Sequence, residues 1–398
     1  MEIKVKDVAS MQFKPFHETF PYCTFGLALS SIYPNKYNIK KRILTFVTII
    51  TFCVFQIFWF LTYTINCLLK LDILNFARNM TLWIIVILFF FKTIYAIKYT
   101  EDFAAILNMI SKDFVKANEM DADYQEIFKT YLKKSKFGEL VWLVIPIILS
   151  SQFPIYPAIL MIMENLETDS PNRYMVHEMD MIYVEHIQYT TPFFEIYFAY
   201  NMTQCLFLSP IFTGFDGSFC IATNHLCLKL KLMTHKVRRA FKDAKNSEQL
   251  RNKMKQAIRD HQEVLDFYTQ LSEFYGFWLL VLFLVASIGV SFNLYQIYMM
   301  RQIVPKYVIF MFSAILHIYI PCVYASNVTE IAKETAVDLY NTPWESCYDP
   351  VVTKYLIFMI ARSQRDMIFN GKGLVNYNMQ LFISLMQSAY SFYTLITS

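Results

Sequence analysis

The stretch FYGFWLLVLFLVASIGVSFNLYQIYMM at residues 274–300 contains no charged side chain and exceeds the roughly 20 residues that a helix needs to cross a bilayer. Similar uncharged runs occupy residues 43–69, 140–163, 196–215, 307–329 and 373–398. A seventh run, residues 79–97, is interrupted only by Lys92, which lies near one end and is expected to extend its ammonium group toward the lipid headgroups. These runs predict an all-α membrane protein with seven transmembrane helices.

The composition agrees with this class of protein. Hydrophobic residues make up 56% of the chain and charged residues 17%, whereas soluble domains carry about 25% charged residues. A chain so poor in charge would be insoluble as a globule, so the lipid bilayer is an expected partner. The basic run at residues 229–245 lies beside a predicted span, where the positive charge of cytosolic loops explains it, and no nucleic acid partner is expected.

The distribution of Lys and Arg predicts the orientation in the membrane. One set of alternate segments comprises residues 1–42, 98–139, 216–273 and 330–372. The other set comprises residues 70–78, 164–195 and 301–306. The first set holds 30 Lys and Arg residues and the second holds 5. Because short cytosolic loops retain positive charge, we expect a cytosolic N-terminus and, after seven spans, an extracellular C-terminus.

This topology divides the chain into four parts. They are a cytosolic N-terminal segment (1–42), transmembrane helices 1–6 with long cytosolic helical loops at 98–139 and 216–273 (43–329), a cytosolic anchor region (330–372), and the last helix (373–398). Ahead of the fifth span, Met254, Ile258, His261 and Leu265 recur at intervals of four and three, so a helix is expected to run from the cytosol straight into the membrane. Helices extended in this way predict an anchor bundle in the cytosol.

A further short helix is predicted in the anchor region, with Asp349 as its N-cap and Pro350 at its first position. It is too short to span a bilayer and must bury its apolar face against protein, for which neighbouring subunits are the expected partner. Gly371 and Gly373 then interrupt the chain, and Asn376 or Asn378 is expected to cap the last helix.

The last helix carries a stripe of polar side chains at intervals of four, three, four, three and four. Its members are Gln380, Ser384, Gln387, Ser391, Thr394 and Ser398. On an α-helix they line one face, which in lipid must look toward protein or water. Small hydroxyls and amides suit the wall of an ion pathway, but they equally let helices pack closely, and the residues alone do not separate the two interpretations.

The chemistry of a catalytic site is not predicted by any motif in the chain. The His and Cys spacings form no metal-ligand set, and we find no nucleophile with a base and no phosphate-binding glycine loop. We therefore expect no enzyme, no metal and no cofactor. His317, alone on an apolar span, is expected to be a hydrogen-bonded packing residue, with the lining of a ligand cavity as the alternative.

An ordered set of C-terminal motifs resembles the signature of the insect odorant receptor family. The set comprises Trp344, LIFMIARSQR at 356–365, Gly-Lys-Gly at 371–373 and YSFYTL at 390–395. The family often reads RSQ or RTQ, then a glycine-containing turn, then SYSYFTLL. Two departures are visible: Phe392-Tyr393 reverses the usual order, and the proline that commonly follows the RSQ-like element is replaced near Arg365 and Asp366.

The resemblance implies an odorant-gated, nonselective cation channel in which four subunits surround one pore and each contributes its last helix. This chain looks like an odorant-tuned subunit, because it lacks the insertion in the second cytosolic loop of the shared co-receptor. The implied partners are that co-receptor, permeant cations and a small volatile ligand, and the implied location is the plasma membrane of a sensory neuron. In the family's pattern the position matching Thr394 lies at the extracellular gate, and the stripe residues around it line the conduit.

The resemblance also places the ligand site in the outer half of the subunit, among the second, third, fourth and sixth spans. The matching candidates in this chain are Trp83, Ile87, Ser151, Tyr156, Phe194, Tyr197, Tyr200, Phe310 and Met311. Aromatic rings and Met around a few hydroxyls suit a small volatile, whose affinity comes mainly from apolar burial. Because the chain has 37 Phe and 27 Tyr, packing or lipid contact is the competing interpretation of each candidate.

Two other classes of membrane protein are alternatives. A G-protein-coupled-type receptor also has seven helices and binds small ligands, but its N-terminus lies outside the cell, against the charge distribution found here. A small-molecule transporter typically has internal repeats and helices broken by Gly or Pro near the middle of the membrane. This chain has only 8 Gly in 398 residues and no visible repeat.

Overall fold

The computed structural model describes residues 12–34, 38–168, 172–300, 304–346 and 349–397. The long helices are α4 (Ile39–Leu69), α5 (Ile73–Lys98), α6 (Thr100–Ala117), α7 (Ala122–Glu167), α8 (Phe193–Leu208), α9 (Gly217–Asp243), α10 (Ser247–Met300) and α11 (Pro305–Tyr340). The shorter helical pieces are α2 (Phe16–Thr19), α3 (Pro21–Leu29), the π-helix η2 (Phe212–Asp216), the 3-10 helix η3 (Trp344–Ser346) and α12 (Pro350–Ser363). A two-stranded hairpin, β1 (Asn370–Gly371) and β2 (Val375–Asn376), precedes the last helix, α13 (Met379–Thr397).

Six helical segments of the described chain are long and apolar enough to cross a membrane. They are α4, α5, α7, the continuous segment from α8 through α9, α10 and α11. Each coincides with a predicted span, which confirms the all-α membrane class. The seventh predicted span forms the 19-residue helix α13, which is not among these six. Which end of the molecule faces the cytosol stays a prediction.

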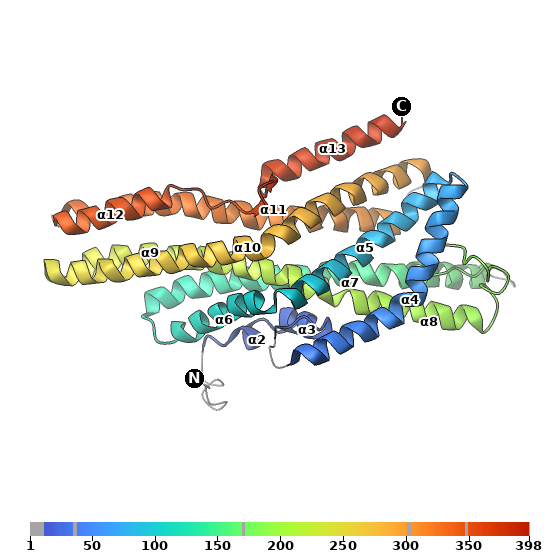
Figure 1. Ribbon diagram of the computed structural model, residues 1–398, viewed down its shortest axis with the longest axis horizontal. Coiled ribbons are helices and arrows are strands. Elements are labelled where there is room, and N and C mark those ends of the chain that lie inside the picture. The colour runs from blue at the N-terminus through green and yellow to red at the C-terminus, as the bar shows by residue number, and fades with distance from the viewer. Residues whose placement is uncertain (1–11, 35–37, 169–171, 301–303, 347–348, 398) are drawn as a thin grey trace.

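The helices form an elongated bundle with two different ends (Figure 1). At one end, here called the anchor end, α12 lies along the extended parts of α10 and α11. At the other, here called the loop end, the described residues 172–192 connect α7 to α8. The prediction of a helix that continues into the fifth span is confirmed, because α10 runs unbroken over 54 residues from the anchor end.

The anchor end has a small apolar core of its own. Met254 of α10 and Leu339 of α11 pack there with Val352, Leu356 and Met359 of α12, and all five are buried. The short predicted helix therefore buries much of its apolar face within its own chain. Asp349 caps this helix as predicted, since its side chain accepts a hydrogen bond from the Val351 amide at 2.9 Å. Ile357 and Phe358 remain 57% and 73% exposed on the other face.

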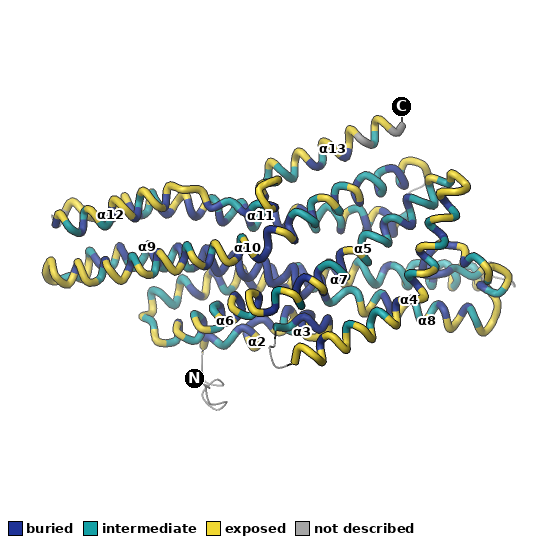
Figure 2. Tube along the Cα trace, viewed as in Figure 1, coloured by how far each residue is buried: buried dark blue, intermediate teal, exposed yellow. Residues whose placement is uncertain are grey.

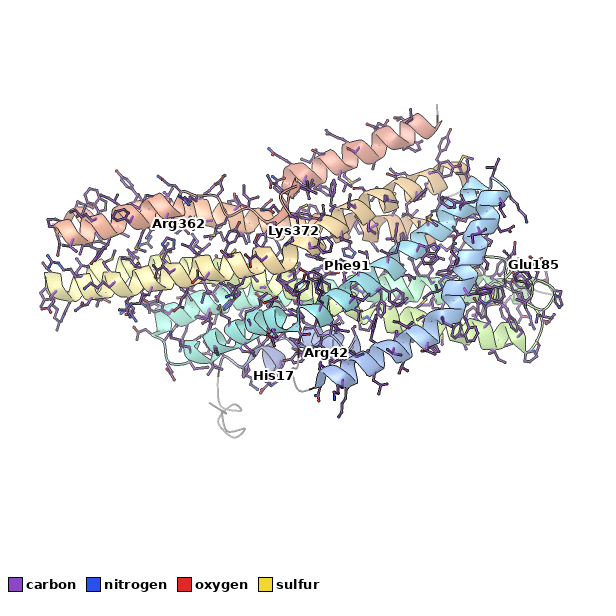
Figure 3. The ribbon with its side chains drawn as sticks, in the orientation of Figure 1. His17, Arg42, Phe91, Glu185, Arg362 and Lys372 are labelled. Atoms are coloured by element: carbon purple, nitrogen blue, oxygen red, sulfur yellow. The ribbon has the colours of Figure 1, made fainter. Side chains whose placement is uncertain are left out.

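The hairpin between α12 and α13 redirects the chain along α10. Figure 3 labels Lys372 in this hairpin, and Figure 2 shows exposed residues recurring along α13 beyond it. A Cβ at Gly371 would lie 3.1 Å from the backbone of Leu280, so only glycine permits this approach to α10. The Tyr377 hydroxyl donates to the Leu279 carbonyl at 2.6 Å, and Asn378 caps α13 by accepting from the Leu381 amide at 2.8 Å. The start of α13 is thus fixed to α10.

Near mid-molecule, α3 packs against the π-helix η2 with almost no space between the two backbones. A Cβ at Gly26 would lie 2.8 Å from the Gly214 nitrogen, and a Cβ at Gly214 would lie 2.5 Å from the Leu27 nitrogen. The Cys23 amide also donates to Glu139 of α7 at 2.9 Å. This contact fixes the segment that joins α8 to α9, and with it the position of Asp216.

Candidate functional site: an apolar cavity and an exposed polar stripe

An apolar cavity lies between α4, α5, α7, α8 and α11, toward the loop end of the bundle. Residues that line it include Ile57 and Phe60 of α4, Leu82 and Val86 of α5, Leu149 and Phe153 of α7, Leu208 of α8, and Ser313 of α11. The volume open to the centre of a water-sized sphere is about 80 Å³. Since one such sphere needs roughly 10–15 Å³ by this measure, the cavity has room for a small molecule of several heavy atoms. It has the apolar wall that is typical of ligand sites.

Two amide side chains interrupt this apolar wall. Gln56 of α4 and Gln204 of α8 are each 4% exposed, and each has an Nε2 without a hydrogen-bond partner among the described residues. The Tyr197 hydroxyl donates to the Oε1 of Gln56 at 2.8 Å, which leaves the Nε2 of that amide as its free donor. Buried N–H groups of this kind are rare in folded proteins unless a ligand or water accepts from them.

His177 closes the cavity from the loop end. Its ring packs edge-on against Phe60 and Phe153, with ring centroids 5.5 and 5.6 Å apart. Burial lowers the pKa of His177 to about 3, and the nearby Lys306 ammonium acts in the same direction, so the imidazole is neutral at physiological pH. The cavity wall therefore carries no formal charge from this residue.

Beyond His177, two polar hollows continue to the surface of the loop end. The inner one shares Leu82, Phe153 and His177 with the cavity, and both hollows are lined by Glu178 and Lys306. Lys306 donates to Glu178, whose other oxygen accepts from the Tyr307 hydroxyl at 2.8 Å. Three separate spaces thus follow one another from the loop end to the cavity, and neighbouring spaces share lining residues.

A buried charge cluster lies at the opposite end of the cavity. The Lys92 ammonium donates to Asp216 at 2.6 Å, and both side chains are fully buried. His317, which lines the cavity, lies 3.1 Å from the same carboxylate, and the ammonium also lies 4.0 Å from the centre of the Phe212 ring. The expectation that Lys92 extends to the headgroups is therefore wrong: a carboxylate from the π-helix satisfies it inside the bundle.

The structure places the nine predicted ligand residues around this cavity, but none of them lines it. Phe310 lines an adjoining space that shares Ser313 and His317 with the cavity, and Tyr156 lines the outer hollow at the loop end. The remaining seven have other surroundings. Ile87 is 47% exposed, Phe194 is buried in a separate cluster, Met311 is half-buried, and Trp83, Ser151, Tyr197 and Tyr200 make hydrogen bonds within or between helices. Contact of the nine with a ligand stays a prediction.

Sequence reasoning missed Gln56, Gln204 and Asp216. The two glutamines are long polar side chains inside otherwise uncharged spans, and that position is a signal for a functional polar group in lipid. Asp216 immediately follows the run 196–215, where the positive-inside pattern assigned it to a loop. Its pairing with Lys92, 124 positions away, required the tertiary structure.

The predicted stripe on α13 is exposed along its described length. Gln380, Ser384, Gln387, Ser391 and Thr394 are all exposed, whereas Ser398 lies outside the described residues. The opposite face packs on the bundle, with Leu385 and Ala389 each 3% exposed and Phe382 stacked edge-on against Tyr319 of α11. Among the described residues, the polar face of α13 is therefore exposed and lies opposite the face that packs on the bundle.

These features define a class of protein: an all-helical membrane protein that encloses an apolar cavity and exposes a polar face on its last helix. A sequence profile described as 7tm Odorant receptor matches residues 72–390. The chain belongs to the insect odorant receptor family, whose members are transmembrane ligand-gated channels rather than enzymes. The family resemblance of the C-terminal motifs is thereby confirmed.

Individual relatives are distant in sequence. Odorant receptor 10 of Aedes albopictus is 23% identical over 321 residues, which cover 77% of this chain and 79% of that protein. Odorant receptor 85c of Drosophila melanogaster is 24% identical over 183 residues, or 46% of each chain.

The fold has a close structural counterpart. The insect olfactory receptor OR5 from Machilis hrabei, in complex with eugenol, matches with a TM-score of 0.75 and 15% identity over 96% of this chain and 99% of that one. A second structure of OR5 gives a TM-score of 0.76 and 14% identity over 96% and 97% of the two chains. At such low identity the likeness establishes the shared fold.

Proposed function

We propose that this chain is an odorant-tuned subunit of a nonselective cation channel, which binds a small volatile in the apolar cavity and opens a central pore lined by α13. Four subunits surround the pore, and at least one of them is the shared co-receptor of the family. In this arrangement the anchor end is cytosolic, the loop end is extracellular, and the channel lies in the plasma membrane of a sensory neuron.

The observation that carries the pore proposal is the position of the stripe on α13. At 3.6 residues per turn, the described stripe residues fall within a sector of about 80° at the centre of the exposed face. Ile383 and Tyr390 flank that sector on one side and Leu395 on the other, and all three are exposed. A helix at the wall of a pore needs a polar sector between two apolar edges, because the middle of its exposed face meets water and the two edges meet neighbouring subunits.

The cavity supports the ligand part of the proposal. An odorant that buries about 200 Å² of apolar surface would gain about 5 kcal/mol, before the cost of immobilising it. The OR5 receptor of similar fold was solved in complex with eugenol. The cavity wall is apolar, and His177 separates it from the hollows of the loop end, so a volatile dissolved at that surface would enter past His177.

Helix α11 provides a direct route from the cavity to the pore face. Ser313 and His317 of α11 line the cavity, and Tyr319, two residues further on, contacts Phe382 of α13 with ring centroids 5.1 Å apart. A ligand that shifts α11 would therefore press on the back of the proposed pore helix. Ligand binding can change the gate only through such a difference in contacts between the closed and open states.

Assembly with other subunits would cover surfaces that this chain leaves exposed. Ile357 and Phe358 of α12 form an exposed apolar pair at the anchor end, and the described stripe residues of α13 are exposed as well. Both surfaces are accounted for by a tetramer in which α12 helices contact one another and α13 helices enclose the pore.

The test is whole-cell current from cells that express this chain with and without an insect odorant co-receptor, during application of volatile esters, aromatics and alcohols. We expect an odorant-evoked cation current that requires both chains. Ser391→Leu or Thr394→Leu should change conductance or ion permeability, whereas the matched control Phe382→Leu on the packed face should alter them much less. Equal effects on the two faces would contradict the assignment of α13 to the pore wall.

A further inference from the structure

We infer that Gln56 and Gln204 make the cavity selective for volatiles that carry a carbonyl oxygen, such as ketones, aldehydes and esters. The inference rests on the proposed function, since it takes the cavity to be the ligand site, and it names the chemical class of the ligand. It depends on two buried glutamines that line the cavity and whose Nε2 groups have no hydrogen-bond partner among the described residues.

Gln56 is held in the orientation that presents its donor. Its side-chain oxygen accepts from the Tyr197 hydroxyl at 2.8 Å, and Tyr197 itself is only 8% exposed. Because the oxygen of this amide is engaged with α8, its Nε2 group is the donor left for a ligand in the cavity that Gln56 lines. Tyr197 is therefore a positioning residue for this amide.

Gln204 contributes the second donor from the facing helix. It lies seven residues after Tyr197, two turns along the same side of α8, and lines the same cavity. Tyr200 fastens this part of α8 to α4, because its hydroxyl donates to the Phe52 carbonyl at 2.6 Å. The two helices that carry Gln56 and Gln204 are thus held together by two tyrosine hydrogen bonds.

The chemistry of the lining selects among ligands. A buried donor without an acceptor is unfavourable, so a hydrocarbon in this cavity would leave both amides unsatisfied. A carboxylate would bring a negative charge into a wall that has no Lys or Arg, which disfavours acids. A carbonyl oxygen is neutral and has two lone pairs, so it can accept from both amides while the rest of the molecule contacts apolar side chains.

The inference is tested with acetophenone and ethylbenzene, which differ only in a carbonyl group in place of a methylene. Each is used to displace a fluorescent apolar probe from the purified full-length protein, in wild type and in the double variant Gln56→Leu with Gln204→Leu. The quantity measured is the ratio of the ethylbenzene to the acetophenone dissociation constant. We expect this ratio to fall by about tenfold or more in the double variant, because two hydrogen bonds to the carbonyl are lost.

Gln152→Leu is the matched control. Gln152 of α7 is also a buried glutamine, 8% exposed and without a hydrogen bond to its amide among the described residues, but it does not line the cavity. Its replacement should leave the ratio unchanged. An unchanged ratio in the double variant would overturn the inference while leaving the cavity as a ligand site. If neither compound displaces the probe from any of the proteins, the proposed function fails and the inference fails with it.

Discussion

The buried ion pair between Lys92 and Asp216 is expected to contribute strongly to the stability of this bundle. Replacing the two residues one at a time and then together tests this expectation. The two charges lie 2.6 Å apart and are fully buried. At an effective dielectric constant of about 20, their attraction is about 6 kcal/mol, which offsets much of the cost of removing both ions from water. Either single change leaves one charge buried without its partner.

We therefore expect Lys92→Met or Asp216→Leu to lower the free energy of unfolding by about 3–5 kcal/mol. The double variant removes both charges and should be more stable than either single variant. It still leaves His317 without the carboxylate that lies 3.1 Å away, which would keep it about 1–3 kcal/mol below wild type.

Tryptophan fluorescence during thermal unfolding of the purified protein in detergent measures this series. Trp142, one of the five tryptophans, is fully buried with its ring centroid 5.1 Å from that of His317, so part of the signal reports on the region of the pair. A double variant less stable than both single variants would refute the electrostatic argument. Single variants as stable as wild type would refute it as well.

Three further predictions concern other parts of the molecule. Gly214→Ala would place a Cβ 2.5 Å from the Leu27 nitrogen and should abolish the monodisperse peak in size-exclusion chromatography, whereas Gly217→Ala, with its nearest contact at 3.6 Å, should leave it intact. The folded-state pKa of His177 is about 3 and its ordinary value is 6.5, so the unfolded chain binds the proton first as pH falls. The contribution of His177 to the free energy of unfolding is therefore complete above pH 6.5 and is lost below that pH, by about 2 kcal/mol at pH 5. His177→Phe should remove that part of the pH dependence in unfolding experiments at pH 7 and about pH 5, and an identical pH dependence in both proteins would contradict this. Tyr197→Phe frees the Gln56 amide to rotate and should weaken acetophenone binding about threefold, with ethylbenzene binding unchanged in the same displacement assay.

Local features of the sequence predicted the fold well because the bilayer leaves few choices. Uncharged runs of about 20 residues or more can form only membrane helices or a buried core. Five of them, together with the run 79–97 that Lys92 interrupts, became the six long apolar helices. The Asp349 cap, the Asn378 cap and the continuous α10 were also predictable, since each depends on residues within a few positions of one another. The α13 stripe belongs to the same group, because helical periodicity alone places its members on one face.

The residues that line the apolar cavity were less predictable. The predicted ligand residues lie on α5, α7, α8 and α11, which border the cavity, but a rotation of one helix by about 100° exchanges a residue for its neighbour, and no local pattern determines that rotation. Phe153 lines the cavity, for example, while the predicted Ser151 hydrogen-bonds within α7. Helix rotation is decided by packing against several other helices at once.

The sequence by itself determined the membrane class, the approximate helix boundaries, the polar face of α13 and, through its C-terminal motifs, the family. Only the tertiary structure decided that Lys92 lies beside Asp216, that Gln56 and Gln204 face one cavity, and that α12 packs on its own chain. The physical reason is the separation along the chain of the residues that interact. Hydrophobic transfer and helical periodicity act on neighbouring residues, whereas the placement of a buried polar group depends on partners that are more than a hundred positions away.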